Sequence, residues 1–341
     1  MTTRSRVCRI GLLGAGRIGR LHAGNILRRI PQLELAAIAD PALDPEWAQL
    51  QPVALKTTDV DAVIAHPDID AVLIATPTPL HIPQIRAAAA QGKAIYCEKP
   101  IGLDEREVLA LMEEINTRGT LLHIGFNRRF DPSFAKVAAG VHAGEIGTPQ
   151  MLCITSRDPA CPPIAYAATS GGMLMDMTIH DFDMARFVMQ SEVVEVHASG
   201  GVLIDPRLEG FGDVDTAIIQ LRFANGALGV INNSRQAVYG YDQRLEVLGS
   251  EGMLQAENCL ENAVRHYRRD DTASANPLYF FLERYEQAFV AGLEAFCTAY
   301  LDGSAAPVSA EDALSALRIA KAAQESLVRN QPVRVCGDTD A

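Results

Sequence analysis

The feature that most constrains the fold is a glycine-rich turn between a predicted strand and a predicted helix. The turn, GAGRIG at residues 14–19, follows the apolar run VCRIGLL and opens a helix predicted over Arg17–Arg29. Glycines at this spacing permit a tight turn and the close approach of a pyrophosphate, whose charge then lies at the helix N-terminus. Because glycine turns are common, the interpretation depends on the segments that follow.

The first third of the chain alternates strand-like with helix-like segments. Further strands are expected at 33–40, 71–77, 93–100 and 121–126, and helices at 59–65, 83–92 and 104–118. This alternation is typical of a parallel sheet covered by helices on both faces. Residues 1–124 are therefore predicted to form a Rossmann dinucleotide-binding domain of the α/β class.

After about Gly125 the strands follow one another through short turns. They are expected at 150–157, 193–204, 216–234 and 242–257, and two helical patterns at 279–301 and 310–328 close the chain. The Asn225-Gly226 pair is typical of a two-residue hairpin loop. Residues 125–336 are therefore predicted to form an α+β domain with a large, mostly antiparallel, open-faced sheet.

An apolar segment from Gly171 to Phe187 carries three ionisable side chains, Asp176, His180 and Asp183. In one continuous helix the three would lie within roughly a 60° arc of a single face, since residues three and four apart are neighbours. Their joint burial would be costly, so we expect them to line a cleft. An isolated Asp-x-x-x-His is more often an ordinary pair on a helix surface.

Three polar residues are predicted at the carboxyl ends of the parallel strands, where open sheets bind ligands. Asp40 lies 24 residues after Gly16, where a carboxylate can bind ribose hydroxyls and repel a 2′-phosphate, which favours NAD over NADP. Thr76 lies at the end of the strand expected at 71–77, and Lys99 at the end of the strand expected at 93–100. The simpler alternatives are a solvated aspartate, a strand stopped by Pro77 and a surface lysine.

Composition excludes several other classes of protein. The formal net charge of −12 disfavours nucleic-acid and anionic-membrane binding. Seven cysteines without a Cys-x-x-Cys pair indicate reduced thiols instead of disulfides or a zinc site, and we expect no metal. The sequence has no signal-peptide pattern and no run of ~18 apolar residues. We therefore expect a soluble, cytoplasmic protein.

Five motifs together resemble the glucose-fructose oxidoreductase/inositol dehydrogenase (Gfo/Idh/MocA) family along nearly the whole chain. They are GAGRIG at 14–19, EKP at 98–100, GFNRRFD at 125–131, GEIG at 144–147 and GGMLMDMTIHDFD at 171–183. Within that family, TSRDPACPP at 155–163 and YGYDQRLEVLGSEGM at 239–253 are most similar to the inositol 2-dehydrogenases.

The resemblance implies an NAD-dependent oxidation of one ring hydroxyl of myo- or scyllo-inositol to the inosose. It implies that His180 takes the hydroxyl proton, that Asp176 orients and supports His180, and that Lys99, held by a cis bond to Pro100, binds the reacting oxygen. The other ring hydroxyls would bind Arg129, Asp158 and Tyr239. The implied cofactor contacts are Gly14, Gly16, Arg17, Ile18, Asp40, Thr76, His81, Glu98 and Lys99. The open sheet would pair subunits into a homotetramer.

The chemistry agrees with these roles independently of the resemblance. Histidine, with an unperturbed pKa of ~6.5, is a suitable base near neutrality, and an ammonium can stabilise a developing alkoxide. Two alternatives stay open. The same chemistry could act on a pyranose sugar, or the chain could be a non-catalytic NAD-sensing regulator, which would not need Lys99, Asp176 and His180.

Overall fold

The computed structural model describes residues 7–167 and 169–335, and the chain divides into two compact units. The first unit comprises the chain up to Asn127 together with 287–314, and the second comprises 128–286 and the chain from Ser315 onward. These units differ from the predicted domains, 1–124 and 125–336, mainly in the segment 287–314. That segment packs with the first unit because Leu293, Phe296 and Cys297 join its hydrophobic core.

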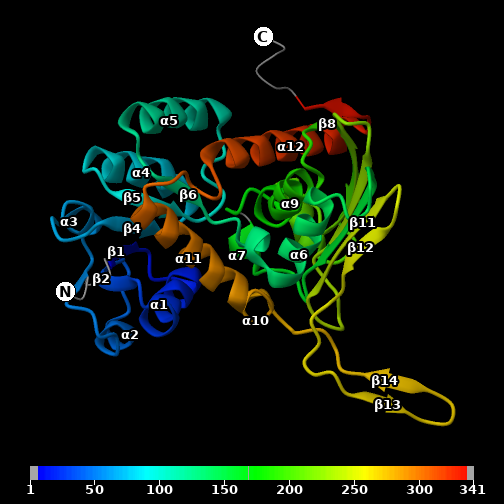
Figure 1. Cartoon of the computed structure of the whole chain (residues 1–341), viewed down its shortest axis with the longest axis horizontal. Coiled ribbons are helices and arrows are strands. Elements are labelled where there is room, and N and C mark those ends of the chain that lie inside the picture. The colour runs from blue at the N-terminus through cyan, green and yellow to red at the C-terminus, as the bar shows by residue number, and fades with distance from the viewer. Residues whose placement is uncertain (1–6, 168, 336–341) are drawn as a thin grey trace. The chain divides into compact units, whose positions relative to one another are not determined.

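The first unit is built on a six-stranded parallel sheet (Figure 1). Its strands are β1 (Cys8–Leu13), β2 (Leu33–Ala39), β3 (Leu55–Thr57), β4 (Ala71–Ile74), β5 (Ala94–Cys97) and β6 (Leu122–Ile124). The spatial order is β3-β2-β1-β4-β5-β6, so the direction of winding reverses between β1 and β4. In sheets of this order, ligands bind at that reversal, outside the carboxyl ends of the strands. The predicted Rossmann fold is confirmed.

The described helices of the first unit are α1 (Arg17–Arg29), α2 (Pro45–Gln49), α3 (Val60–Ile64), η1 (Thr78–Leu80, a 3-10 helix), α4 (His81–Ala90), α5 (Glu105–Arg118) and α11 (Glu286–Asp302). Of these, α1, α3, α4 and α5 begin and end within two residues of the predicted positions, whereas α2 and η1 were not predicted. Helix α5 shows why such bounds can be predicted: the Asp104 carboxylate accepts hydrogen bonds from the amides of Arg106 and Glu107, and Gly119 ends the helix at a φ of 63°.

The second unit is built on a seven-stranded mixed sheet. Its strands are β7 (Pro149–Arg157), β8 (Val193–Gly201), β9 (Thr216–Phe223), β10 (Leu228–Ser234), β11 (Asp242–Gly249), β12 (Met253–Ala256) and β15 (Val333–Arg334). The spatial order of the strands is β12-β11-β7-β10-β9-β8-β15. Among these described strands, β7 and β10 are parallel neighbours, and the other neighbouring pairs are antiparallel. The mostly antiparallel sheet is therefore confirmed. Along β9, buried Ile219 and Leu221 alternate with outward-facing residues.

The hairpin between β9 and β10 has a longer loop than predicted. The amide of Phe223 donates to the carbonyl of Ala227 at 3.0 Å, which leaves three residues, 224–226, in the loop. Gly226 has a φ of 87°, whereas among the described residues other than glycine a positive φ occurs at Gln190 and Asn330 alone. A two-residue type I′ loop needs a positive φ at both positions, so the prediction of two residues was wrong.

Helices α6 and α9 pack on the seven-stranded sheet, α9 against β7 and α6 against β11 and β12 (Figure 1). The helices of this unit are η2 (Asn127–Phe130), α6 (Pro132–His142), α7 (Ile164–Ala167), α8 (Met173–Asp176), α9 (Ile179–Met189), η3 (Pro206–Phe211), α10 (Phe281–Arg284) and α12 (Ala310–Arg329), whose first residues belong to the first unit. The helix predicted over 279–301 is interrupted at Tyr285, which separates α10 from α11.

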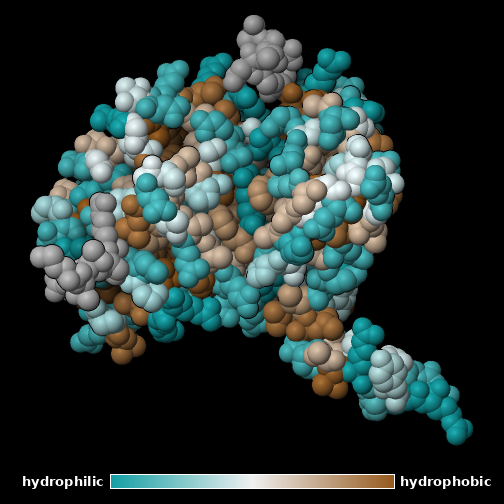
Figure 2. Space-filling view, viewed as in Figure 1, coloured by the Kyte–Doolittle hydropathy of each residue, from teal (hydrophilic) through white to brown (hydrophobic). Residues whose placement is uncertain are grey.

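A two-stranded hairpin, β13 (Arg265–Tyr267) with β14 (Thr272–Ser274), projects from the second unit (Figure 1). All six of its strand residues are exposed, and its surface is largely hydrophilic toward the tip (Figure 2). In the described part of the chain, no helix has the length and apolar character needed to cross a membrane.

Candidate active site

The glycine turn has the geometry that a bound dinucleotide requires. Gly14 has a φ of 93°, in the left-handed region, and a Cβ there would lie 2.6 Å from the carbonyl oxygen of Ala75. A Cβ at Gly19 would lie 1.9 Å from the carbonyl oxygen of Gly14, so this glycine lets α1 pack against the turn. A Cβ at Gly16 would meet no described atom within 4 Å. The middle glycine therefore faces open space, where a pyrophosphate would approach.

The start of α1 and the end of β2 complete this cradle. Helix α1 has neither a side-chain cap nor an acidic residue in its first turn, so its N-terminus suits an anion. The Asp40 carboxylate accepts hydrogen bonds from the amides of Ala15, at 2.6 Å, and Ala42, at 2.7 Å. Both bonds hold this half-buried carboxylate beside the turn. The residues present therefore fit an adenine dinucleotide with a free ribose diol.

The carboxyl ends of β4 and β5 are joined through His81. One ring nitrogen of His81 lies 2.8 Å from the carbonyl oxygen of Thr76, and the other lies 2.8 Å from that of Pro100. Burial lowers the pKa of His81, which is 1% exposed. The enclosed ring therefore joins the backbone at the two strand ends. Direct contact of His81 with the cofactor stays a prediction.

The other predicted residues of this region lie around the same strand ends. The Thr76 hydroxyl donates to Oε1 of Gln84 at 2.7 Å. Oε1 of Glu98 lies 2.7 Å from Nε2 of the buried His22, which fixes the carboxylate that precedes Lys99. The bond between Lys99 and Pro100 is cis, as the resemblance implies.

The segment that carries Asp176 and His180 is two helices and not one. Helix α8 ends at Asp176 and α9 begins at Ile179. The amides of Met177 and Thr178 both donate to the carbonyl of Met173, and the Thr178 hydroxyl donates to Oδ1 of Asn233 at 2.7 Å. These contacts turn the chain between the helices. The predicted single stripe of three ionisable groups was therefore wrong.

Asp183 lies in the core of the second unit, apart from such a stripe. Its carboxylate forms a bidentate ion pair with Arg129, with Nε–Oδ2 at 2.8 Å and Nη2–Oδ1 at 2.5 Å. The Arg129 guanidinium also lies 4.8 Å from the centre of the Phe187 ring. This pair fastens η2 to α9. Direct binding of a substrate hydroxyl by Arg129 stays a prediction.

Asp181, in the same segment, is a residue that sequence reasoning missed. It is fully buried, forms an ion pair with Arg128 and accepts a hydrogen bond from Nδ2 of Asn233 at 3.0 Å. Burial raises the pKa of Asp181, although Arg128 opposes that shift. The signal was present as paired motifs: two consecutive arginines in GFNRRFD face two aspartates at i and i+2 in HDFD.

Two predicted carboxylates of the second unit, Asp158 and Asp176, meet at Arg235. Nη1 of Arg235 lies 3.5 Å from Oδ2 of Asp176 and 3.7 Å from Oδ2 of Asp158. The Tyr166 hydroxyl donates to the other Asp176 oxygen at 2.8 Å. Burial, together with the Asp176 charge, raises the pKa of Asp158 to about 6, and the Arg235 guanidinium limits that rise. His180 follows, half-buried, in the first turn of α9.

The position of Arg235 follows from the parallel pairing of β7 with β10. In that register Arg157 faces Ser234, so the next residues, Asp158 and Arg235, leave the sheet together. Tyr239 lies in the connection that follows β10. Its hydroxyl donates to Oδ2 of Asp242 at 2.7 Å and accepts a hydrogen bond from Arg157 at 3.1 Å.

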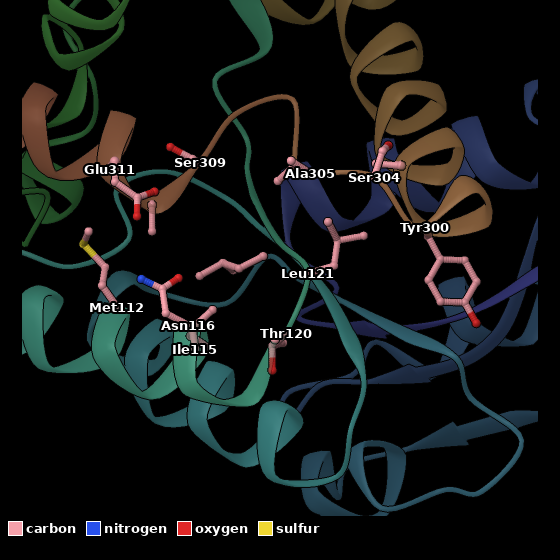
Figure 3. Close-up of a pocket in the computed structure, with 16 residues that line it drawn as sticks. Met112, Ile115, Asn116, Thr120, Leu121, Tyr300, Ser304, Ala305, Ser309 and Glu311 are labelled. Carbon is pink, nitrogen blue, oxygen red and sulfur yellow. The ribbon is translucent and has the colours of Figure 1, made fainter.

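A separate groove lies in the first unit, away from the predicted residues. It is bordered by α5, the end of α11 and the segment that leads to α12 (Figure 3). Its lining is mainly apolar or small, with Asn116 and Glu311 among the polar side chains. None of the predicted cofactor or substrate residues lines it.

Comparisons with known proteins agree with both units. Residues 8–126 match the model of an oxidoreductase family with an NAD-binding Rossmann fold, and residues 134–255 match the GFO/IDH/MocA C-terminal domain. Fold and site thus define an oxidoreductase with a dinucleotide-binding domain. The chain belongs to the Gfo/Idh/MocA family.

Similar proteins cover nearly the whole chain. It is 45% identical to the myo-inositol 2-dehydrogenase of Thermotoga maritima, over 96% of this chain and 98% of that protein. It is 43% identical to the inositol 2-dehydrogenase of Rhizobium meliloti, over 96% and 99%. The structure of scyllo-inositol dehydrogenase from Lactobacillus casei with bound NAD(H) and scyllo-inositol matches with a TM-score of 0.90 at 31% identity, covering 97% of this chain and 100% of that chain.

Proposed function

We propose that this protein oxidises a ring secondary hydroxyl of myo- or scyllo-inositol to the inosose, with NAD as the hydride acceptor. The observation that carries the proposal is the 45% identity to a myo-inositol 2-dehydrogenase over 96% of the chain. The polar surroundings of Asp158, Asp176 and Tyr239 support it, because a polyol needs several hydrogen-bonding partners.

For the cofactor, we propose that Gly14, Gly16, Arg17 and Ile18 hold the pyrophosphate at the start of α1 and that Asp40 binds the adenosine ribose. Thr76, Glu98 and Lys99 would lie along the rest of the dinucleotide. When bound, NAD supplies the acceptor for the hydride that leaves the carbinol carbon.

For the reaction, His180 takes the hydroxyl proton. Asp176, held by Tyr166 and Arg235, orients the imidazole and stabilises its cationic form. The Lys99 ammonium binds the same oxygen and stabilises the negative charge that develops on it. Lys99 comes from the first unit, and Asp176 and His180 come from the second, so the proposal requires the two units to present them to one substrate. Arg129, Asp158 and Tyr239 would bind the remaining hydroxyls.

Steady-state rates on inositol isomers and hexopyranoses, each with NAD and with NADP, test this proposal. We expect kcat/KM to be highest for an inositol with NAD. Turnover of a pyranose alone would support the alternative sugar substrate. Tight NAD binding with no turnover on any substrate of the panel would support the regulator.

For assembly, we propose that the open face of the seven-stranded sheet pairs subunits, in a homotetramer. Four exposed apolar side chains, Leu228, Met151, Leu248 and Met253, are register neighbours on β10, β7, β11 and β12. Directly opposed residues share one face of a sheet, so these side chains form one apolar row. Contiguous apolar surface of this kind is typical of an interface. The cytoplasmic location stays a prediction from the sequence.

A further inference from the structure

We propose that Arg235 is a positioning residue of the active site, whose buried guanidinium holds Asp158 and Asp176 together and sets the charge that they present to His180 and the substrate. This inference rests on the proposed function, because it assigns Asp176 to the support of the base. It adds a residue that neither the motifs nor the family description identifies.

The first support is that Arg235 is buried without a close ion pair. Its side chain is 2% exposed, and its contacts to the two carboxylates are 3.5 and 3.7 Å long. Within the described residues, Nε and Nη2 of Arg235 donate to no acceptor. By contrast, the buried Arg129 and Arg284 each form a close, two-nitrogen pair with one aspartate. A buried cation shared between two carboxylates acts mainly through its field.

The second support is that the backbone fixes the place of Arg235. The amide of Asp158 donates to the carbonyl of Ser234 at 2.9 Å, and the amide of Ala237 donates to the carbonyl of Asp158 at 2.7 Å. The amide of Arg235 itself donates to the carbonyl of Asp215 at 2.8 Å. The first two bonds continue the β7–β10 pairing past the strand ends, and the third continues the β9–β10 pairing. The guanidinium therefore starts from a rigid position beside Asp158.

The third support is the repulsion between the negative charges of Asp158 and Asp176, which the Arg235 guanidinium offsets. Burial and the neighbouring Asp176 raise the pKa of Asp158 to about 6, so Asp158 already binds a proton not far below neutrality. Without Arg235, repulsion would keep a proton on the pair at higher pH. A protonated pair stabilises the imidazolium that forms during the reaction less well. The turnover number kcat would therefore fall over the whole pH range in which the pair is protonated.

The other groups around Asp158 do not replace this cation. Arg128 and Asp181 also act on Asp158, but they are engaged in their own buried ion pair. Burial raises the pKa of Tyr241 well above its ordinary value and also raises that of Cys161, so both stay neutral near pH 7. On Asp176, the Tyr166 hydroxyl is a neutral donor. Arg235 places one nitrogen within 4 Å of a carboxylate oxygen of each aspartate.

The test compares kcat from pH 6 to 10, at saturating inositol and NAD, for the wild type, Arg235→Gln and Arg235→Lys. We expect Arg235→Gln to move the acidic limb of the profile, where kcat falls as the pH falls, up by about one pH unit. For a limb near pH 6 to 6.5, that shift lowers kcat about five- to eightfold at pH 6 and about two- to threefold at pH 7, and leaves it nearly unchanged at pH 9.5. Arg235→Lys should return the acidic limb most of the way to its wild-type pH. Asp158→Asn combined with Arg235→Gln should also return the limb toward that pH, because the two carboxylates no longer repel each other.

Arg284→Gln is the matched control, since Arg284 is equally buried in the same unit and pairs with Asp131. It should lower the Tm and leave the acidic limb in place. If Arg235→Gln lowers kcat by one factor at every pH, Arg235 only supports the fold and the inference is overturned. If Arg235→Gln does not fold, the kcat–pH profile of Asp158→Asn tests the inference. We expect the acidic limb of that variant to lie at lower pH than in the wild type, and an unmoved limb overturns the inference.

Failure of the proposed function is distinguishable from failure of this inference. If the wild type oxidises no inositol, the Tm measured from pH 4 to 8 tests Arg235 without activity. In Arg235→Gln the decline of Tm with rising pH should extend above pH 6, because the carboxyl pair keeps its proton longer. A Tm difference from the wild type that is constant over this range would overturn the inference.

Discussion

Asp40 accepts a hydrogen bond from the amide of Ala15 at 2.6 Å, so the end of β2 is fastened to the glycine turn that follows β1. The carboxylate that would recognise the ribose thereby shares one rigid frame with the amides that would face the pyrophosphate. Under the proposed function, this contact would link cofactor choice to phosphate binding.

Replacing Asp40 should therefore change cofactor preference. We expect Asp40→Ser to lower kcat/KM for NAD by about 10- to 100-fold, the range for a lost hydrogen bond to a charged group, and to lower it much less for NADP. The ratio of the two kcat/KM values is the measurement. Asp59→Ser, at the cap of α3 in the same unit, is the control and should leave the ratio unchanged. An unchanged ratio in Asp40→Ser would remove Asp40 from the ribose site.

Lys99→Ala and His180→Ala should each lower kcat strongly, by about 10²- to 10⁴-fold, because both side chains are proposed to act on the reacting oxygen. NAD affinity, measured by isothermal titration calorimetry, should change little. Wild-type turnover in either variant would exclude that residue from the chemistry.

Oxidation by the wild type should be faster at alkaline pH, since turnover releases a proton and His180 must be neutral to accept one. A rate that stays flat from pH 6 to 10 would contradict the role of His180 as a base.

The raised pKa of Asp158 also predicts how stability depends on pH. The folded chain keeps this carboxyl protonated up to about pH 6, whereas the unfolded chain loses the proton near pH 4. The free energy of unfolding should therefore fall as the pH rises from about 4 to 6, by up to about 3 kcal/mol from this residue. Asp158→Asn should lack that part of the decline in urea titrations. Parallel profiles for the two proteins would refute the shift.

The buried pair of Asp183 with Arg129 should be far more important for stability than an exposed one. We expect Asp183→Asn to cost about 3 to 5 kcal/mol in urea unfolding, because it leaves a buried guanidinium without its counter-charge. Glu192→Gln, which breaks the more exposed pair of Arg186 with Glu192, is the control and should cost less than about 1 kcal/mol. Equal costs would show that the Asp183 pair is not specially placed.

The apolar row on the sheet predicts a charge-sensitive assembly. Met151→Asp should shift the molar mass measured by light scattering toward smaller species, because a charge would be buried at the interface. Val328→Asp, at an exposed apolar residue of α12, should leave the mass unchanged. A wild type that is monomeric at micromolar concentration would end the homotetramer proposal.

The local parts of this fold could be predicted because their causes lie close together in the chain. Helix α1 covers the residues expected, since the glycine turn fixes its start and Pro31 follows its end. The break between α8 and α9 was missed because one of its causes is the bond from Thr178 to Asn233, which is 55 residues away. The loop of the β9–β10 hairpin was predicted one residue too short, because its length depends on where pairing resumes beyond Gly226.

The candidate site likewise contains some residues that the sequence could identify and one that it could not. Asp40, Lys99, Asp176 and His180 could be proposed from motifs and strand ends. Arg235 could not, because its importance comes from the parallel register of β7 with β10, which joins segments 77 residues apart. Nothing near Arg235 in the sequence marks it as different from a surface arginine.

The parallel pair inside a sheet of hairpins has a consequence for how such enzymes diversify. A hairpin turn connects two neighbouring antiparallel strands directly, so a change in the length of the turn disturbs the register of that pair. The segments that leave β7 and β10 are free of that restraint, because the two strands point the same way and neither is the other's direct continuation. Selection could therefore lengthen, shorten or recharge these exits beyond the bonds that join Asp158 to Ser234 and Ala237, and so reshape the proposed substrate site while the sheet beneath it is inherited unaltered.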